Sequence, residues 1–256
     1  MKKSRKFDLV LFLIWPIIAS LLSFLWHVNI LGATILFFVL PGIYLSLRSR
    51  KCVARAALFS LTCLLFLLAA EYFAIKNSAW LFNPEALVLP RLLNTVALEA
   101  VLWEFAWVYL VTLFFEHFFD KDAHTNLAGP RLKFLFFAFM VVFISTLLLA
   151  VNEIPASVPY YYLILGIITS VIPISFVLFE RPTLFTTLAK VTLYFTYLHF
   201  VMEITEMALG HWTFPGQFLY GLDLFAQKLP AEELLFWVIL GGAAIVSLYQ
   251  YFDEKR

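Results

Sequence analysis

The chain has 256 residues, of which 63% are hydrophobic and 14% are charged, and its mean hydropathy is +0.91. An ordinary soluble domain has about 45–50% apolar and about 25% charged residues, so this composition excludes a soluble fold. The net charge of +1 gives no reason to expect a nucleic-acid partner.

The apolar residues form blocks of about 20 residues, the length that a helix needs to cross a hydrocarbon core of about 30 Å. Barrel strands would be about half as long and would alternate in polarity. We therefore expect an all-α integral membrane protein of about eight transmembrane helices. The blocks cover residues 8–26, 29–47, 56–75, 95–119, 134–151, 160–179, 191–210 and 231–251.

Basic residues outside the blocks predict the orientation, because short loops rich in Lys and Arg stay in the cytoplasm. Fifteen of the 18 Lys and Arg residues lie at the two chain ends and in alternate loops. This distribution places the N- and C-termini in the cytoplasm and predicts a multi-pass protein of the cell (cytoplasmic) membrane. The alternative for the first block, a cleaved signal peptide, has a shorter apolar region of about 7–15 residues.

An internal repeat divides the chain into two predicted four-helix units, residues 1–130 and 131–256, which together form one membrane domain. Three pairs share an offset of 132 residues: Pro41 and Pro173, Glu71 and Glu203, Trp80 and Trp212. Because each unit holds an even number of spans, we expect parallel copies with a site where they meet.

Two segments of the outer face, 76–94 and 211–229, are rich in aromatic residues and broken by proline. We expect them to lie over the mouth of the bundle as interfacial or re-entrant pieces. Each leads into a helix that opens with carboxylates.

Glu99, Glu232 and Glu233 lie in the first turn of the fourth and eighth spans. An ionisable residue inside a span costs about 2.5–3.5 kcal/mol at the helix centre, which makes these glutamates functional candidates. Ordinary capping is the alternative, because the helix dipole favours a carboxylate there.

An aromatic residue follows each of these carboxyl groups at i+4, on the same helix face. These rings belong to Trp103, Phe236 and Trp237. A carboxyl group in a dry pocket keeps its proton and can act as a general acid, while π faces stabilise a developing cation. The alternative is an interfacial belt of aromatic residues.

A polar stripe in the seventh span consists of His199, Glu203 and Glu206, and Glu71 is the repeat partner of Glu203. We expect these four residues to face the bundle interior as supporting polar groups. One histidine with scattered glutamates is a poor set of metal ligands, so we expect no metal.

The other polar and aromatic residues are given structural roles. Glu104 and Glu116 are interpreted as packing residues, and 160–162, three consecutive tyrosines, as an aromatic belt. Cys52 and Cys63 offer neither a disulfide framework nor a metal cluster.

Residues 229–237, Leu-Pro-Ala-Glu-Glu-Leu-Leu-Phe-Trp, resemble the Pro-x-Glu-Glu-x-x-Phe-Phe signature of the lycopene cyclase domain family, the heterodimeric or CarR-type cyclases. Ahead of them, Glu203 and the Gly-x-Trp-x-Phe sequence at 210–214 are similar to that family's lead-in. The chain departs from the pattern at Trp237, where the signature has Phe, and at Glu203, where we expect Asp. Two four-helix units resemble the family's fused form.

The resemblance implies an enzyme that converts acyclic ψ ends of lycopene to β- or ε-rings. The reaction is redox-neutral and consists of protonation, cyclisation and deprotonation, so no cofactor is expected. The implied partners are the lipophilic carotenoid substrate, the lipid bilayer and other carotenoid enzymes. The implied roles are Glu232 or Glu233 as the acid, Glu99 as the base or second acid, and Trp80, Trp103, Trp212, Phe236 and Trp237 as cation-stabilising or substrate-binding rings.

Two alternatives stay open at this point. A carotenoid 1,2-hydratase of the same family would let water capture the cation, and His199, Glu203 and Glu206 could hold that water. A membrane transporter or scaffold is an alternative of another class, since parallel repeats with acidic residues inside the membrane also occur in carriers.

Overall fold

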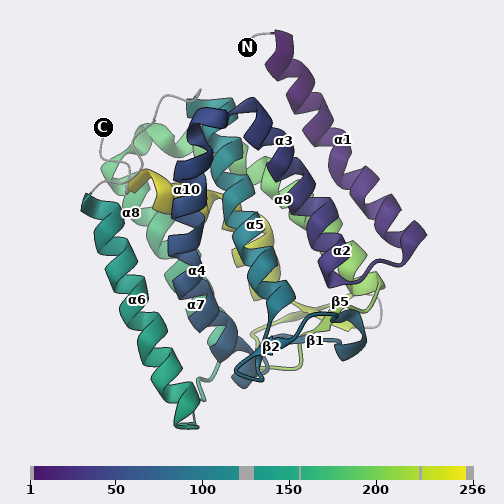
Figure 1. The fold of residues 1–256 in the computed structure, drawn as a ribbon, viewed down its shortest axis with the longest axis vertical. Coiled ribbons are helices and arrows are strands. Elements are labelled where there is room, and N and C mark those ends of the chain that lie inside the picture. The colour runs from purple at the N-terminus through teal and green to yellow at the C-terminus, as the bar shows by residue number, and fades with distance from the viewer. Residues whose placement is uncertain (1–2, 121–129, 156, 225–226, 252–256) are drawn as a thin grey trace.

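The computed structural model describes residues 3–120, 130–155, 157–224 and 227–251, which form a bundle of helices with short strands at one end (Figure 1). The first half contains α1 (Lys3–Trp26), α2 (Ile30–Thr34), α3 (Leu40–Arg48), α4 (Val53–Lys76) and α5 (Leu98–Phe115). The second half contains α6 (Pro130–Val151), α7 (Tyr161–Gly166), α8 (Ile172–Glu180), α9 (Phe185–Ala208) and α10 (Gly241–Tyr251).

Six helical stretches of the described chain are long and apolar enough to cross a membrane. The bent pair of the π-helix η7 (Glu233–Ile239) and α10 makes a seventh if it forms one span. Most of the remaining predicted block, 191–210, is helical within α9, which ends at Ala208, but α9 is not among these stretches. The protein is therefore a mostly helical membrane protein.

The repeat appears as matching elements 132 residues apart. The π-helix η1 (Ile35–Val39) corresponds to η5 (Ile167–Val171), α3 to α8, the 3-10 helix η2 (Arg50–Cys52) to η6 (Pro182–Leu184), and α4 to α9. In Figure 1 the first helix of each half, α1 and α6, lies at an opposite edge of the bundle. Few side chains of α1 and α6 are buried, which suits contact with lipid.

Two prolines explain the two matching π-helices. Pro41 and Pro173 each follow a π-helix by two residues. Proline has no N–H to donate, and its ring collides with the carbonyl four residues earlier in a regular α-helix. The wider turn relieves this collision: the backbone N–H of Leu40 donates to Ile35, five residues back, and that of Ile172 donates to Ile167.

The last helix breaks after a third π-helix. η7 and α10 meet at an angle of 54°, and the glycines Gly241 and Gly242 begin α10. A Cβ at Gly241 would lie 2.7 Å from Cζ2 of Trp107, and one at Gly242 would lie 2.7 Å from Cβ of Phe195. These glycines therefore let α10 approach α5 and α9 closely, which fixes the direction of η7.

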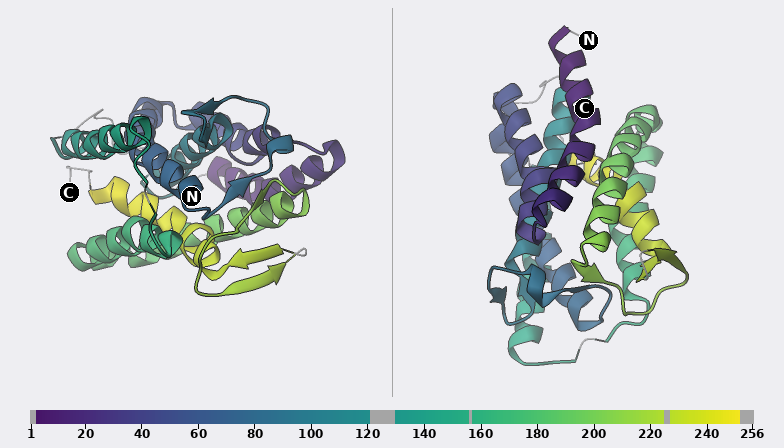
Figure 2. Two further views of the ribbon diagram at one scale, coloured as in Figure 1. Left: turned by 90° about the horizontal axis from the view of Figure 1, so that it is seen from below. Right: turned by 90° about the vertical axis from the view of Figure 1, so that its right-hand side faces the viewer.

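The two outer segments meet at one end of the bundle (Figure 2). Strand β1 (Leu81–Phe82) pairs antiparallel with β4 (Trp212–Thr213), which joins the two halves. Each segment also contains a small antiparallel pair, β2 (Arg91–Leu92) with β3 (Val96–Ala97), and β5 (Gly221–Leu224) with β6 (Gln227–Pro230). The all-helical prediction did not include these strands; they add to the helical bundle in the region where interfacial pieces were expected.

A polar cluster ties the helices together at the opposite end. The fully buried Asp8 of α1 accepts hydrogen bonds from the Tyr44 hydroxyl at 2.6 Å, from Nη2 of Arg48 at 3.0 Å and from Nε2 of His117 at 2.9 Å. Nearby, the Tyr249 hydroxyl of α10 donates to the buried Glu116. A buried carboxylate needs such partners, so these bonds hold α1, α3, α10 and the π-helix η4 (Glu116–Asp120) that follows α5 in register.

Candidate functional site

Each half of the protein supplies one glutamate that is hydrogen-bonded to a tryptophan nine residues further along the chain. Nε1 of Trp80 donates to both carboxylate oxygens of Glu71, at 3.2 and 3.0 Å. Nε1 of Trp212 donates to Oε1 of Glu203 at 2.9 Å. Because Trp212 is paired with Phe82 across β1 and β4, the strand pairing brings the two glutamate–tryptophan pairs to one place.

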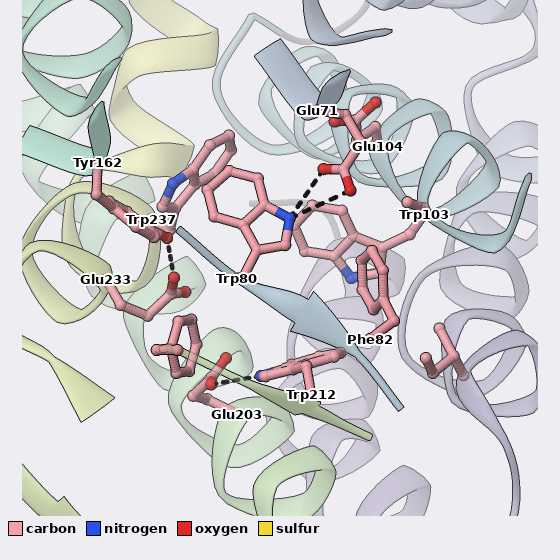
Figure 3. A pocket seen from close by; sticks show the side chains of 13 residues that line it. Glu71, Trp80, Phe82, Trp103, Glu104, Tyr162, Glu203, Trp212, Glu233 and Trp237 are labelled. Carbon is pink, nitrogen blue, oxygen red and sulfur yellow. Dashed lines mark hydrogen bonds between the residues drawn. The ribbon is translucent and has the colours of Figure 1, made fainter. Parts of the chain in front are cut away.

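Two further carboxyl groups face the same place (Figure 3), one buried (Glu104) and one half-buried (Glu233). Glu104 of α5 lies beside Glu71, and no described residue hydrogen-bonds to its Oε2. Glu233 opens η7 and accepts a hydrogen bond from the Tyr162 hydroxyl of α7. Four carboxyl groups from four helical elements therefore converge in the bundle.

Aromatic rings lie between these carboxyl groups. The Trp237 ring lies 6.5 Å from that of Trp80 and 6.3 Å from that of Trp103, centroid to centroid. Trp80 also meets Tyr162 edge to face at 5.1 Å, and Phe82 meets Trp212 at 6.3 Å. Such π systems stabilise a cation by about 2 kcal/mol or more where water is excluded.

These side chains line a cavity of about 70 Å³ between the two halves, which we call the acid cavity. An engineered cavity of about 150 Å³ holds one benzene molecule. The acid cavity is smaller, so a group the size of benzene or larger enters only if side chains of its wall change rotamer. Its wall consists of Ile30, Glu71, Trp80, Phe82, Ala100, Trp103, Glu104, Tyr162, Glu203, Trp212, Phe214, Glu233 and Trp237.

Glu99 and Glu232, two of the three carboxylates predicted to be catalytic, are buried but lie outside that wall. Oε1 of Glu99 accepts the backbone N–H groups of Val88 and Leu89 at 2.7 and 2.6 Å, and Oε1 of Glu232 accepts that of Leu219 at 2.6 Å. Each carboxylate thus holds one of the two outer segments against the helix that follows that segment. Their Oε2 atoms, like that of Glu104, have no partner among the described residues. Because neither side chain lines the cavity, this geometry favours a structural role over the predicted catalytic one.

Phe236, His199 and Glu206 also lie outside the acid cavity. Phe236 packs against Gly166, where a Cβ would collide with its ring. Nδ1 of His199 lies 3.2 Å from the carbonyl oxygen of Trp237, and Glu206 bonds to His211. Of the predicted polar stripe, Glu203 alone reaches the cavity wall.

Sequence reasoning missed Glu104 and Tyr162, which it treated as a packing residue and as part of an aromatic belt. Glu104 follows Glu99 by five residues and so points to another side of α5. Its signal was present, because an ionisable residue well inside a span is a functional candidate. For Tyr162, the run of three tyrosines gave no means of telling which one faces inward.

Among the described residues, no group of three or more His, Cys, Asp or Glu side chains is arranged to hold a metal ion. Comparison with known proteins identifies no relative: no family model, no curated protein and no solved structure matches this chain. Functional inference therefore depends on the cavity itself and on the resemblance of residues 229–237.

Proposed function

We propose that this protein is a lycopene cyclase, which closes the acyclic ψ ends of lycopene to β- or ε-rings. The observation that carries the proposal is one cavity with four carboxyl groups among tryptophan rings, including Glu233 of the signature-like segment. In this proposal α9 completes eight spans of the cell membrane, the halves are parallel repeats, and both chain ends lie in the cytoplasm.

Hydrogen bonding supports a division of roles between the carboxyl groups. A carboxylate that accepts hydrogen bonds is stabilised in its ionised form, whereas one in apolar surroundings without donors favours its neutral form. Glu104, with no donor for Oε2 among the described residues, suits the proton donor. Glu233, which accepts from Tyr162, suits the base. This assignment differs from the sequence-based one, in which Glu233 or Glu232 was the acid.

The reaction then follows from this arrangement. Glu104 gives its proton to the terminal double bond of the ψ end, and a tertiary carbocation forms. The internal alkene attacks that cation and closes the ring, and Glu233 removes a proton from the ring to leave a β- or ε-double bond. The rings of Trp80, Trp103 and Trp237 stabilise the positive charge, and because they carry no nucleophile they do not capture it.

The glutamate–tryptophan pairs place a carboxyl group on each wall of the cavity. The carboxyl oxygens of Glu71 and Glu203, each held by an indole N–H, carry a negative partial charge that stabilises the developing cation. The reaction has no redox step, so these side chains suffice for its chemistry. A ψ end is larger than benzene, and its entry needs movement of the tryptophan wall.

Expression in cells that accumulate lycopene tests the proposal. Ring-bearing carotenoids support a cyclase, hydroxylated acyclic ends indicate a hydratase, and unchanged lycopene favours a carrier or scaffold. The Glu233→Gln variant should insert into the membrane normally, which immunoblotting of the membrane fraction checks, and should form no product. Full ring formation in that variant would remove Glu233 from the mechanism.

A further inference from the structure

A second cavity, of about 180 Å³, lies behind the acid cavity. We call it the chain cavity. It lies between α4, α5, α6, η5 and the η7–α10 bend, and Trp237 lines both cavities. Its wall consists of Cys63, Phe66, Leu67, Trp107, Val108, Leu135, Phe139, Ile168, Thr169, Ser170, Pro173, Trp237, Gly241, Ala244, Ile245 and Leu248.

The wall of the chain cavity offers little to a polar ligand. Its two hydroxyl groups are already used: Ser170 donates to the carbonyl oxygen of Phe236 at 3.1 Å, and Thr169 donates to that of Leu165 at 2.8 Å. The indole N–H groups of Trp107 and Trp237 have no partner among the described residues. Most of the other lining side chains are aliphatic or aromatic. A mostly apolar wall of this kind favours apolar ligands.

An indole series connects the two cavities. Trp237 contacts Trp80 of the acid cavity at 6.5 Å and Trp107 of the chain cavity at 5.1 Å, between ring centroids. The bend at Gly241 makes this contact possible, because a Cβ there would strike Trp107. The two cavities are therefore adjacent, with the Trp237 side chain in the wall of both.

We propose that the chain cavity is a second binding site, for the hydrocarbon chain of a polyene whose end occupies the acid cavity, with Trp237 as the side chain that separates the two subsites. This inference rests on the proposed function for the identity of the polyene. It adds a subsite that selects long, linear, apolar chains, since a short terpene bound at the acid cavity would not reach the chain cavity. An acyl chain of a bilayer lipid shares this chemistry, and the test separates the two sources.

The test uses the full chain in detergent micelles with lycopene, in the Glu233→Gln background so that the pigment is not consumed. Lycopene is achiral, so a circular dichroism signal in its visible absorption band reports pigment held in a protein site. Ala244→Phe fills the chain cavity, and Ala138→Phe makes the same change on the exposed face of α6. The new ring in Ala244→Phe should displace a part of the lycopene chain equivalent to two CH₂ groups, which lowers lycopene affinity about tenfold or more. Ala138→Phe should leave the affinity unchanged.

A second filling variant guards against misfolding. Ile168 lines the chain cavity from η5 but is 49% exposed, so Ile168→Trp should fold and also weaken the signal. Equal lycopene affinity in all of these variants would overturn the proposal. So would loss of copurifying phospholipid in Ala244→Phe, by mass spectrometry, with lycopene affinity unchanged, because the occupant would then be a lipid acyl chain.

The two proposals fail in different ways. If the wild-type protein makes rings and Ala244→Phe makes them equally well with unchanged affinity, the chain subsite is wrong and the cyclase stands. If the dichroism signal appears and responds to Ala244→Phe while the wild-type protein makes no rings, the cyclase is wrong and the chain site stands.

Discussion

Replacement of Tyr162 by Phe tests the site with the loss of a single oxygen atom. The Tyr162 hydroxyl donates to Glu233, while its ring packs edge to face on Trp80 at 5.1 Å. Tyr162→Phe keeps the ring and removes the hydrogen bond. If Glu233 is the base, its carboxylate loses orientation and charge stabilisation at the moment when it must take the proton.

The size of the effect follows from the kind of bond that is lost. A hydrogen bond to a charged group contributes about 1.5–3 kcal/mol, which corresponds to about a 10- to 150-fold fall in kcat. The KM for lycopene should stay near its wild-type value because no contact with the hydrocarbon is removed. The assay is ring formation from lycopene in micelles, followed by chromatography of the pigments.

The adjacent tyrosine is the matched control. The Tyr161 hydroxyl donates to the backbone carbonyl of Ala70 at 2.8 Å rather than to a carboxyl group. Tyr161→Phe should lower the thermal stability by about 1 kcal/mol and leave kcat unchanged. Equal losses of kcat in the two variants, or none in Tyr162→Phe, would refute the role given to Glu233 and its tyrosine.

Three further changes test the structural assignments. Glu99→Gln and Glu232→Gln keep an acceptor oxygen for the outer-segment N–H groups and should retain most ring formation. If either variant lost ring formation as completely as Glu233→Gln, that glutamate would have a catalytic role. Gly241→Ala should lower stability by about 1–3 kcal/mol through overpacking against Trp107, which is measured as a lower Tm in detergent. The control Gly42→Ala, whose Cβ would lie 3.5 Å from Tyr109, should change Tm little. Equal shifts of Tm in the two variants would contradict this packing. Asp8→Asn should lower stability by about 1.5–3 kcal/mol at the far end of the bundle without changing the products formed, and altered products would contradict a purely structural role for that cluster.

Features set by local chemistry were the ones that the sequence could predict. The matching prolines Pro41 and Pro173 marked equivalent places in the two halves, and the structure adds that each follows a π-helix, because the missing N–H acts within its own turn. The repeat offset likewise placed Glu71 with Glu203 and Trp80 with Trp212. The structure adds that each glutamate accepts from its own tryptophan, a contact made by the turn between helix and strand.

Features set by packing between distant elements were not predictable in this way. Glu99 and Glu104 both lie on α5, and helical periodicity cannot say which side meets the other half of the protein. The outer segment determines which glutamate faces the cavity. The backbone N–H groups of Val88 and Leu89 hydrogen-bond to Glu99, whereas Glu104 lines the cavity. In the same way, the carboxylate of Glu232 binds Leu219, while that of its neighbour Glu233 turns inward to Tyr162.

Solvent deuterium labelling tests most directly whether carboxyl groups of the acid cavity protonate a polyene. With lycopene and the wild-type protein in D₂O, mass spectrometry should find one deuterium in each new ring, because the carboxyl proton exchanges with solvent before each turnover. Glu104→Gln should give neither rings nor label, while Glu233→Gln should return acyclic lycopene labelled at its terminal double bonds, since protonation without a base reverses. Unlabelled rings from the wild-type protein, or full ring formation in both variants, would contradict the proposed mechanism.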